Sequence, residues 1–132
     1  MGTISYLLDT HVFLWSVQRD ILLSKTVKPI VEDKNTDLYI SAVSAYEILN
    51  KYRLGKMPEY AKIAENYFYI SDRFNAKDLP INAKHAHYAG KFDWDHRDPF
   101  DRILAAQAYM ESMVLITNDK VFNSLPCIKT LW

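Results

Sequence analysis

The residues of this sequence best suited to chemistry are acids at the ends of predicted strands and helices. Asp9 and Asp119 come directly after short apolar runs that predict strands, and Glu47 lies in a helix predicted after a third run. Asp98 and Asp101 lie at the start of a further predicted helix. Carboxylates held close together repel one another, and a hard divalent cation such as Mg²⁺ or Mn²⁺ relieves that repulsion. A site of this kind polarises a phosphate and activates water, which is nuclease chemistry.

The elements predicted around these acids place them at one edge of a sheet. Apolar runs predict short strands at 4–8, 38–40, 114–117 and 128–132, with an extended piece around 77–81. Helices are predicted at 10–17 with Thr10 as a possible cap, after Ser24, from Ser41 to about Arg53, from Tyr60 onward, at 83–90 and from Pro99. This alternation predicts an α/β fold with a mainly parallel central sheet of four to five short strands flanked by helices. Because strand carboxyl ends gather at one edge of such sheets, we expect the acids to converge there.

Composition narrows the class of protein. The 132 residues suit a single domain over 1–132, and 49% hydrophobic residues provide a core. The formal net charge is +0, so binding to a polyanion has to come from local patches or from bound metal. Cys127 is the one cysteine, which excludes an internal disulfide and fits a reducing compartment. With no apolar stretch near the length of a membrane span, we expect a soluble, cytoplasmic protein.

Four motifs, in this order and spacing, resemble those of PIN-domain nucleases and, more narrowly, of the VapC-type toxins of bacterial toxin–antitoxin pairs. They are LLDTH at Leu7–His11, SAYEI at Ser44–Ile48, DPFDRILAAQA at Asp98–Ala108 and TNDKVF at Thr117–Phe122. The resemblance implies a single PIN-like domain and a Mg²⁺- or Mn²⁺-dependent endoribonuclease that leaves a 5′-phosphate and a 3′-hydroxyl. It also implies a homodimer held inactive by a cognate antitoxin.

The same resemblance assigns the site residues. The four acids are Asp9, Glu47, Asp101 and Asp119. We expect Asp9 and Asp101 to bind the metal directly, and the other two to act through water, one of them orienting the attacking water. Four polar residues are expected to support them: Thr10, Ser41, Thr117 and Asn118. Asp98 resembles an accessory acid found with the DPFDR form, although it serves equally well as the N-cap of the following helix.

Each acid also has a purely structural interpretation. Asp9 can cap the helix that follows it, and Asp119 beside Asn118 is a natural turn residue. Glu47 can pair with Lys51 one helical turn later. The convergence of all the acids on one edge favours a site over these separate explanations. Candidate RNA contacts are the basic residues near the acids, namely Arg97, Arg102, Lys120 and Lys51.

Other chemistries fit the sequence less well. His85 and His87 lie on different faces of a predicted helix with no CxxC or HExxH partner, which argues against zinc. His11 and His96 lie near the proposed site, where a plain polar role is expected. A phosphatase that uses Asp9 as its nucleophile would need a second Asp two residues later, where this chain has His11. A PIN-fold module that binds a partner without catalysis is the remaining alternative.

Overall fold

The computed structural model describes residues 2–132 and contains five strands, seven α-helices and three short 3₁₀ helices within that range. The strands are β1 (Ser5–Leu8), β2 (Asp37–Ser41), β3 (Lys77–Leu79), β4 (Val114–Ile116) and β5 (Lys129–Leu131). The α-helices are α1 (Thr10–Gln18), α2 (Val27–Glu32), α3 (Ala42–Arg53), α4 (Ala61–Glu65), α5 (Tyr67–Arg73), α6 (Ala83–Lys91) and α7 (Pro99–Met110). The 3₁₀ helices are η1 (Asp20–Leu22), η2 (Pro58–Tyr60) and η3 (Lys120–Ser124).

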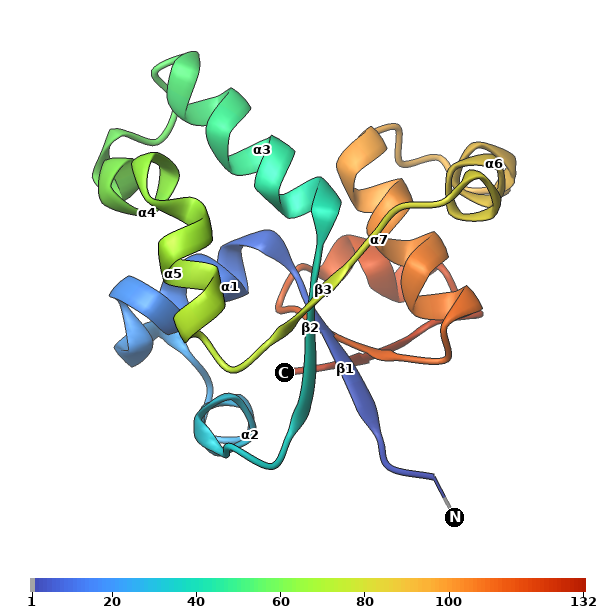
Figure 1. The fold of residues 1–132 in the computed structure, drawn as a ribbon. Coiled ribbons are helices and arrows are strands. Elements are labelled where there is room, and N and C mark those ends of the chain that lie inside the picture. The colour runs from blue at the N-terminus through green and yellow to red at the C-terminus, as the bar shows by residue number, and fades with distance from the viewer. Residues whose placement is uncertain (1) are drawn as a thin grey trace.

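All five strands form one sheet in the order β3-β2-β1-β4-β5, and each neighbouring pair is parallel. The predicted α/β class and parallel sheet are therefore confirmed. Strand β1 is central and β2 and β4 lie on either side of it (Figure 1). Because the strands are parallel, the segments that follow β1, β2 and β4 leave the sheet at one edge. Those segments carry Asp9, the start of α3 and Asp119.

Helices cover both faces of the sheet, with α1, α2, α4 and α5 on one face and α6 and α7 on the other (Figure 1). Alternation along the strands sends neighbouring side chains to opposite faces. Leu8 and Ile116 belong to the core cluster shared with α1 and α4, whereas Leu7 and Leu115 belong to the cluster shared with α7. Two separate apolar cores therefore fix β1 and β4 from both faces, which gives the strand ends a rigid support.

The predicted helix from Tyr60 onward is wrong as one element. It is divided at Asn66, which has φ −126° and ψ 34°, into the two short helices α4 and α5. The Asn66 side chain donates a hydrogen bond to the Lys62 carbonyl, a local bond that competes with a continuous helix. The break lets Tyr67 and Ile70 pack against the core while Phe68 remains exposed.

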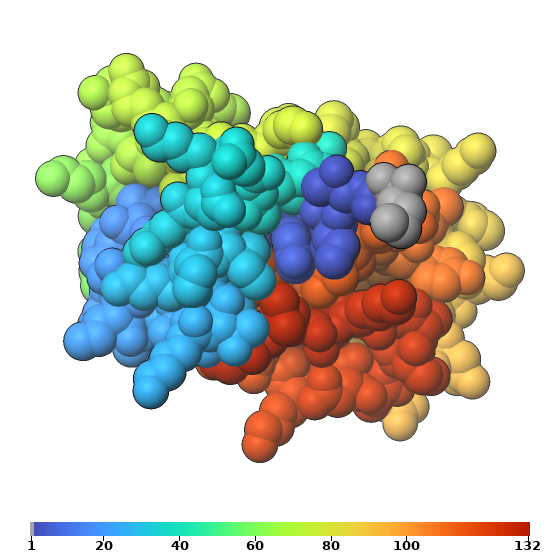
Figure 2. All heavy atoms as spheres, turned by 90° about the horizontal axis from the view of Figure 1, so that it is seen from below, coloured from blue at the N-terminus to red at the C-terminus, as the bar shows by residue number. Residues whose placement is uncertain are grey.

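Figure 2 shows the face of the molecule opposite the predicted acid edge, seen from below the view of Figure 1. The start of β1 lies there between the region of α2 and the C-terminal segment that includes β5. Within residues 2–132 none of the helices has both the length and the apolar character needed to cross a membrane.

Candidate active site

A pocket of about 200 Å³ lies at the carboxyl edge of the sheet and is lined by acids from four separate segments. Its acidic residues are Asp9, Glu47, Asp98, Asp101 and Asp119. The remaining lining residues are Thr10, His11, Leu14, Lys51 and Met57. The four acids expected to converge are therefore together in the structure, and the accessory acid is with them.

Asp9 is buried at the end of β1 and both of its carboxylate oxygens accept hydrogen bonds. Oδ1 accepts from the Thr10 backbone N–H at 2.7 Å, and Oδ2 accepts from the Thr117 hydroxyl at 2.7 Å. Asp9 caps α1, so the expectation that Thr10 is the cap is wrong. Burial raises the pKa of Asp9, and the nearby His11 and the two hydrogen bonds offset this only in part. A carboxylate that is costly to charge is thus held in place by its neighbours.

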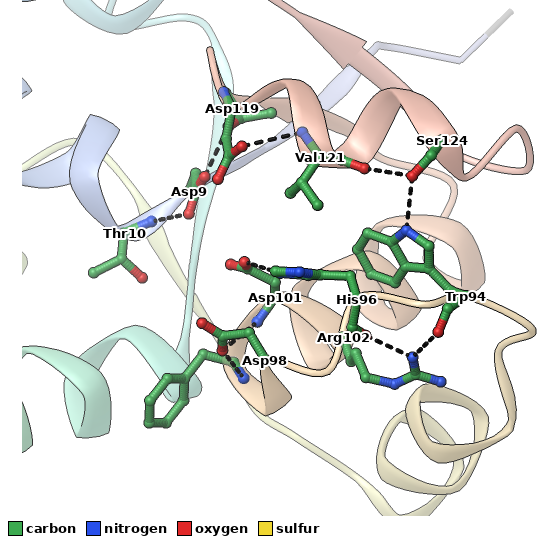
Figure 3. Close-up of polar contacts among 12 residues, drawn as sticks. Asp9, Thr10, Trp94, His96, Asp98, Asp101, Arg102, Asp119, Val121 and Ser124 are labelled. Carbon is green, nitrogen blue, oxygen red and sulfur yellow. Dashed lines mark hydrogen bonds and ion pairs between the residues drawn. The ribbon is translucent and has the colours of Figure 1, made fainter.

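Thr117 connects two of the acids. Its hydroxyl donates to Asp9 and accepts a hydrogen bond of 3.0 Å from the Asp119 backbone N–H. The Asp119 carboxylate accepts from the Val121 backbone N–H at 3.0 Å and so caps η3 (Figure 3). The predicted turn role of Asp119 and its place in the pocket are therefore both observed.

Thr10 and Ser41, two of the expected supporting residues, make different contacts, and only Thr10 lines the pocket. The Thr10 and Ser44 hydroxyls share a hydrogen bond of 2.8 Å inside the protein, which ties α1 to α3. Ser41 is fully buried and its Oγ accepts from the Val43 backbone N–H, capping α3. Ser41 does not line the pocket. Its contribution is to begin the helix that carries Glu47.

Glu47 projects from α3 into the pocket and is buried. Lys51 Nζ lies 2.5 Å from Glu47 Oε2, so the pairing expected at this spacing is also present. Burial disfavours the charged lysine, but the Glu47 hydrogen bond and the charges of Glu47, Asp98 and Asp101 outweigh it and raise the pKa of Lys51. Lys51 is thus a firmly charged cation inside the acid pocket.

Asp98 and Asp101 lie one helical turn apart at the start of α7 and have different environments. Asp98 Oδ1 accepts from the backbone N–H groups of Phe100 at 2.9 Å and Asp101 at 3.4 Å, so Asp98 is the N-cap. Burial raises the pKa of Asp101 to about 6, and the Asp9 and Asp98 charges add to this while the hydrogen bond from His96 opposes it. The charged form of Asp101 is therefore stabilised by a positive partner.

Two histidines contact the acids more closely than the sequence suggested. His11 Nε2 lies 2.6 Å from Asn118 Oδ1, and its Nδ1 lies 3.3 Å from Asp9 Oδ2. His96 Nε2 lies 2.7 Å from Asp101 Oδ2 (Figure 3). The short spacing of each histidine from its acid was a usable signal. The sequence did not indicate the path of the loop before α7, and this path decides whether the His96 side chain turns toward Asp101.

The basic candidates separate into two groups. Arg97 and Lys120 are exposed beside the pocket, on the loop before α7 and at the start of η3. Arg102 instead donates four hydrogen bonds to backbone carbonyls of the preceding segment, and no ion pair with Asp98 is formed among the described residues. Its guanidinium is engaged by the protein, so we no longer assign Arg102 to the substrate.

The remaining histidines and the cysteine lie away from the pocket. His85 is buried, with its Nδ1 accepting from the Asn82 backbone N–H in the cap of α6, whereas His87 is exposed on the same helix. Cys127 is exposed.

The donor set of the pocket fits a hard divalent cation. Mg²⁺ and Mn²⁺ prefer carboxylate and water oxygens, and the pocket provides carboxylates from several elements. One ligand atom from each of His96, Asp98 and Asp101 lies within 4.8 Å of the others. Burial is the largest cause of the raised pKa of both Asp9 and Asp101, and a neighbouring acid adds to it in each case: Glu47 for Asp9 and Asp9 for Asp101.

Solved structures with a similar fold cover nearly the whole of this chain. A chain in the crystal structure of VapBC2 from Rickettsia felis bound to a promoter DNA fragment has a TM-score of 0.71 and 18% identity, covering 97% of this chain and 98% of that chain. A chain of DNA-bound VapBC from Salmonella typhimurium has a TM-score of 0.72 and 16% identity, covering 98% of each chain. At these identities the likeness concerns the fold alone.

A sequence relative and a family model complete the comparison. Ribonuclease VapC16 of Mycobacterium tuberculosis is 38% identical over 63 residues, which are 47% of this chain and 43% of the relative, so the match spans less than half of its length. The family model described as PIN domain matches residues 6–126, a range that includes all five pocket acids. This chain therefore belongs to the PIN domain family.

Proposed function

We propose that this chain is a divalent-metal-dependent endoribonuclease that acts as the toxin of a toxin–antitoxin pair. The observation that carries the proposal is the convergence of Asp9, Glu47, Asp101 and Asp119 in one pocket of a PIN domain. The 38% identity to a relative named as a ribonuclease supports the choice of RNA as substrate. The fold shared with chains of VapBC complexes supports the toxin role.

In this proposal Asp9 and Asp101 bind Mg²⁺ or Mn²⁺ directly, while Glu47 and Asp119 act through water. When bound, the cation offsets the negative charge of the pocket, polarises the scissile phosphate and activates water. Glu47 or Asp119 orients the attacking water toward phosphorus. The oxygen of this water forms the new bond to phosphorus as the bond to the 3′ oxygen breaks. The products are then a 5′-phosphate and a 3′-hydroxyl.

We propose that three cations of the chain bind the RNA backbone. Lys51 lies inside the pocket, and Arg97 and Lys120 are exposed beside it. With no net charge on the protein, phosphate contacts depend on such local groups. We assign to them the binding of the phosphates on either side of the bond that is cleaved.

A protein partner is proposed for the apolar surface of α3 and α5. Tyr46, Leu49 and Phe68 are 62%, 54% and 74% exposed, and a hollow of about 340 Å³ lies between these helices. Exposed apolar side chains that gather around a hollow are typical of interaction sites. We propose that the antitoxin covers this surface, and that the toxin is a homodimer.

The decisive experiment compares the purified protein with Asp9→Asn and Asp101→Asn on structured and single-stranded RNA. We expect cleavage with Mg²⁺ or Mn²⁺, none with EDTA, and none in either variant, while circular dichroism shows the fold retained. Asp72→Asn, the same change at an exposed acid of α5, is the matched control and should cleave normally. RNA cleavage in EDTA, or full activity in both variants, would contradict the proposal.

Two further measurements separate the parts of the proposal. Sequencing of RNA 5′ ends after induced expression identifies the target and the position of the cut. Light scattering measures whether the chain is a dimer. A protein that binds no Mn²⁺ and cleaves no RNA would instead be a PIN-fold module that acts by binding alone.

A further inference from the structure

Arg102 fastens the segment between α6 and α7. Its Nε donates to the Ala89 carbonyl at 2.8 Å and its Nη2 to the Phe92 carbonyl at 2.6 Å. Its Nη1 donates to the carbonyls of Trp94 and His96, each at 2.8 Å. Four of the five guanidinium N–H groups are therefore used on one short stretch of backbone.

The segment has little else to hold its backbone. Residues 93–97 form no backbone–backbone hydrogen bond with any described residue. Outside the Arg102 contacts, Trp94 Nε1 donates to Ser124 Oγ at 2.9 Å, which attaches the segment to η3 (Figure 3). Besides the packing of Phe92 and Trp94 against the core, this loop is held by side-chain hydrogen bonds, and most of those come from Arg102.

The fastened segment ends on the acid pocket. The His96 carbonyl is one of the four that Arg102 holds, and the His96 ring lies 5.1 Å from the Trp94 ring. From this position His96 Nε2 reaches Asp101 Oδ2 at 2.7 Å. Asp101 and Arg102 are adjacent on α7, so the helix that presents the acid also controls the loop that contacts it.

We propose that Arg102 and His96 are positioning residues, with Arg102 shaping the 92–97 segment so that His96 fixes the Asp101 carboxylate for cation binding. This inference rests on the proposed function, because it takes Asp101 as a metal ligand. His96 Nε2–H donates to Oδ2, which sets the rotation of the carboxylate. The lone pairs of the other oxygen then remain available to the pocket. Such partners of metal ligands typically change metal affinity by about 10- to 100-fold.

The first test measures Mn²⁺ affinity by calorimetric titration, with RNA absent. His96→Ala should weaken Mn²⁺ binding by about 10-fold or more. His96→Gln, which returns an N–H donor of similar reach, should recover most of the affinity. A role limited to packing of the ring would not be recovered in this way. His87→Ala, at an exposed histidine of α6, is the matched control and should bind Mn²⁺ as the wild type does.

The second test asks whether Arg102 acts through His96. Arg102→Lys keeps the charge but has too few donors, in the wrong geometry, for four carbonyls. It should weaken Mn²⁺ binding, and the double variant with His96→Ala should lose no more affinity than His96→Ala alone. In metal-free protein, the His96 Nε2 proton should be slowly exchanging by NMR in the wild type and lost in Arg102→Lys. Arg73→Lys on α5 is the matched control, and Arg102→Gln replaces Arg102→Lys if the latter does not fold.

The outcomes distinguish this inference from the function on which it rests. Wild-type protein that binds no Mn²⁺ overturns both. Wild-type binding with unchanged affinity in His96→Ala overturns the positioning role alone. Losses in Arg102→Lys and His96→Ala that multiply in the double variant show that the two residues act independently, which also overturns it.

Discussion

Thr117 Oγ1 donates a hydrogen bond of 2.7 Å to Asp9 Oδ2, across 108 positions of sequence. The two residues lie at the ends of β4 and β1, which are neighbouring parallel strands. The bond therefore joins the first and last of the acidic motifs, because the same hydroxyl also accepts from the Asp119 backbone N–H. The register of β1 and β4 is what brings the two motifs within hydrogen-bond distance.

Thr117→Val should weaken the site and the fold together. Valine has nearly the same shape but leaves a buried Asp9 oxygen without its donor, at a cost of about 1–3 kcal/mol. We expect a lower free energy of unfolding in urea and weaker Mn²⁺ binding. Thr117→Ser keeps the hydroxyl and should resemble the wild type in both measurements. Equal behaviour of the two variants would contradict this account of Thr117.

The two aspartates at the start of α7 should respond differently to substitution. Asp98→Asn retains a good N-cap, so its unfolding free energy should stay close to that of the wild type, whereas Asp98→Ala should lose about 0.5–2 kcal/mol. Asp101→Asn should abolish Mn²⁺ binding, with a much smaller loss in Asp98→Asn. Urea denaturation and Mn²⁺ titration on the three variants check this. Loss of Mn²⁺ binding in Asp98→Asn would make Asp98 a ligand as well as a cap.

The stability of the metal-free protein should depend on pH through Asp101. Its pKa is raised from 3.8 to about 6 by burial, so the unfolded chain releases this proton first. The stability that the protonated Asp101 adds to the folded state is fully present below pH 3.8, its ordinary pKa, and is lost as the pH rises through the folded pKa of about 6. We expect the melting temperature in EDTA to fall over this range, with a smaller fall in Asp101→Asn. An equal slope in both proteins would contradict the assignment.

Added Mg²⁺ should reverse this trend. The cation binds the deprotonated carboxylates, so its affinity rises as the pH passes through the raised pKa of Asp101. A saturating concentration should raise the melting temperature of the wild type at neutral pH, and by less at pH values below the ordinary carboxyl range. Asp101→Asn should show no shift at any pH.

The exposed cations beside the pocket should contribute to RNA affinity through salt-dependent contacts. Arg97→Met and Lys120→Met should each weaken binding of single-stranded RNA to the inactive Asp101→Asn protein. Each should also reduce the slope of log affinity against log salt by about 0.7, the value for one phosphate contact on a single strand. Lys25→Met removes an exposed lysine outside the pocket and serves as the control. Unchanged slopes would remove Arg97 and Lys120 from the interface.

Much of the fold followed from local pattern. The strands predicted at 4–8 and 114–117 fall on the observed β1 and β4, because short buried strands in parallel sheets carry few polar residues. The acids could be placed together in advance because parallel strands end at a common edge. Ser41 and Asp98 begin α3 and α7 as caps, which their residue types indicate without any tertiary information.

The predictions that failed depend on tertiary contacts. The division of the helix at Asn66 follows from one side-chain hydrogen bond and from the packing of Tyr67 and Ile70 against the core. Arg102 lies among acids in sequence, which suggested RNA, yet its partners are carbonyls of a loop whose path no local pattern describes. The contact between His96 and Asp101 depends on the path of the same loop.

Because β1 is the central strand, the two sides of the pocket differ in how readily they open to solvent. Asp9 follows a strand flanked on both sides, whose Leu7 and Leu8 are completely buried, and such segments open to solvent only when the whole molecule unfolds. His96 belongs instead to a segment held by side chains. Amide hydrogen exchange should therefore find the slowest protons of the protein beside Asp9, while the groups around Asp101 exchange through local opening. The Asp101 side is therefore where the pocket can change shape without unfolding of the sheet.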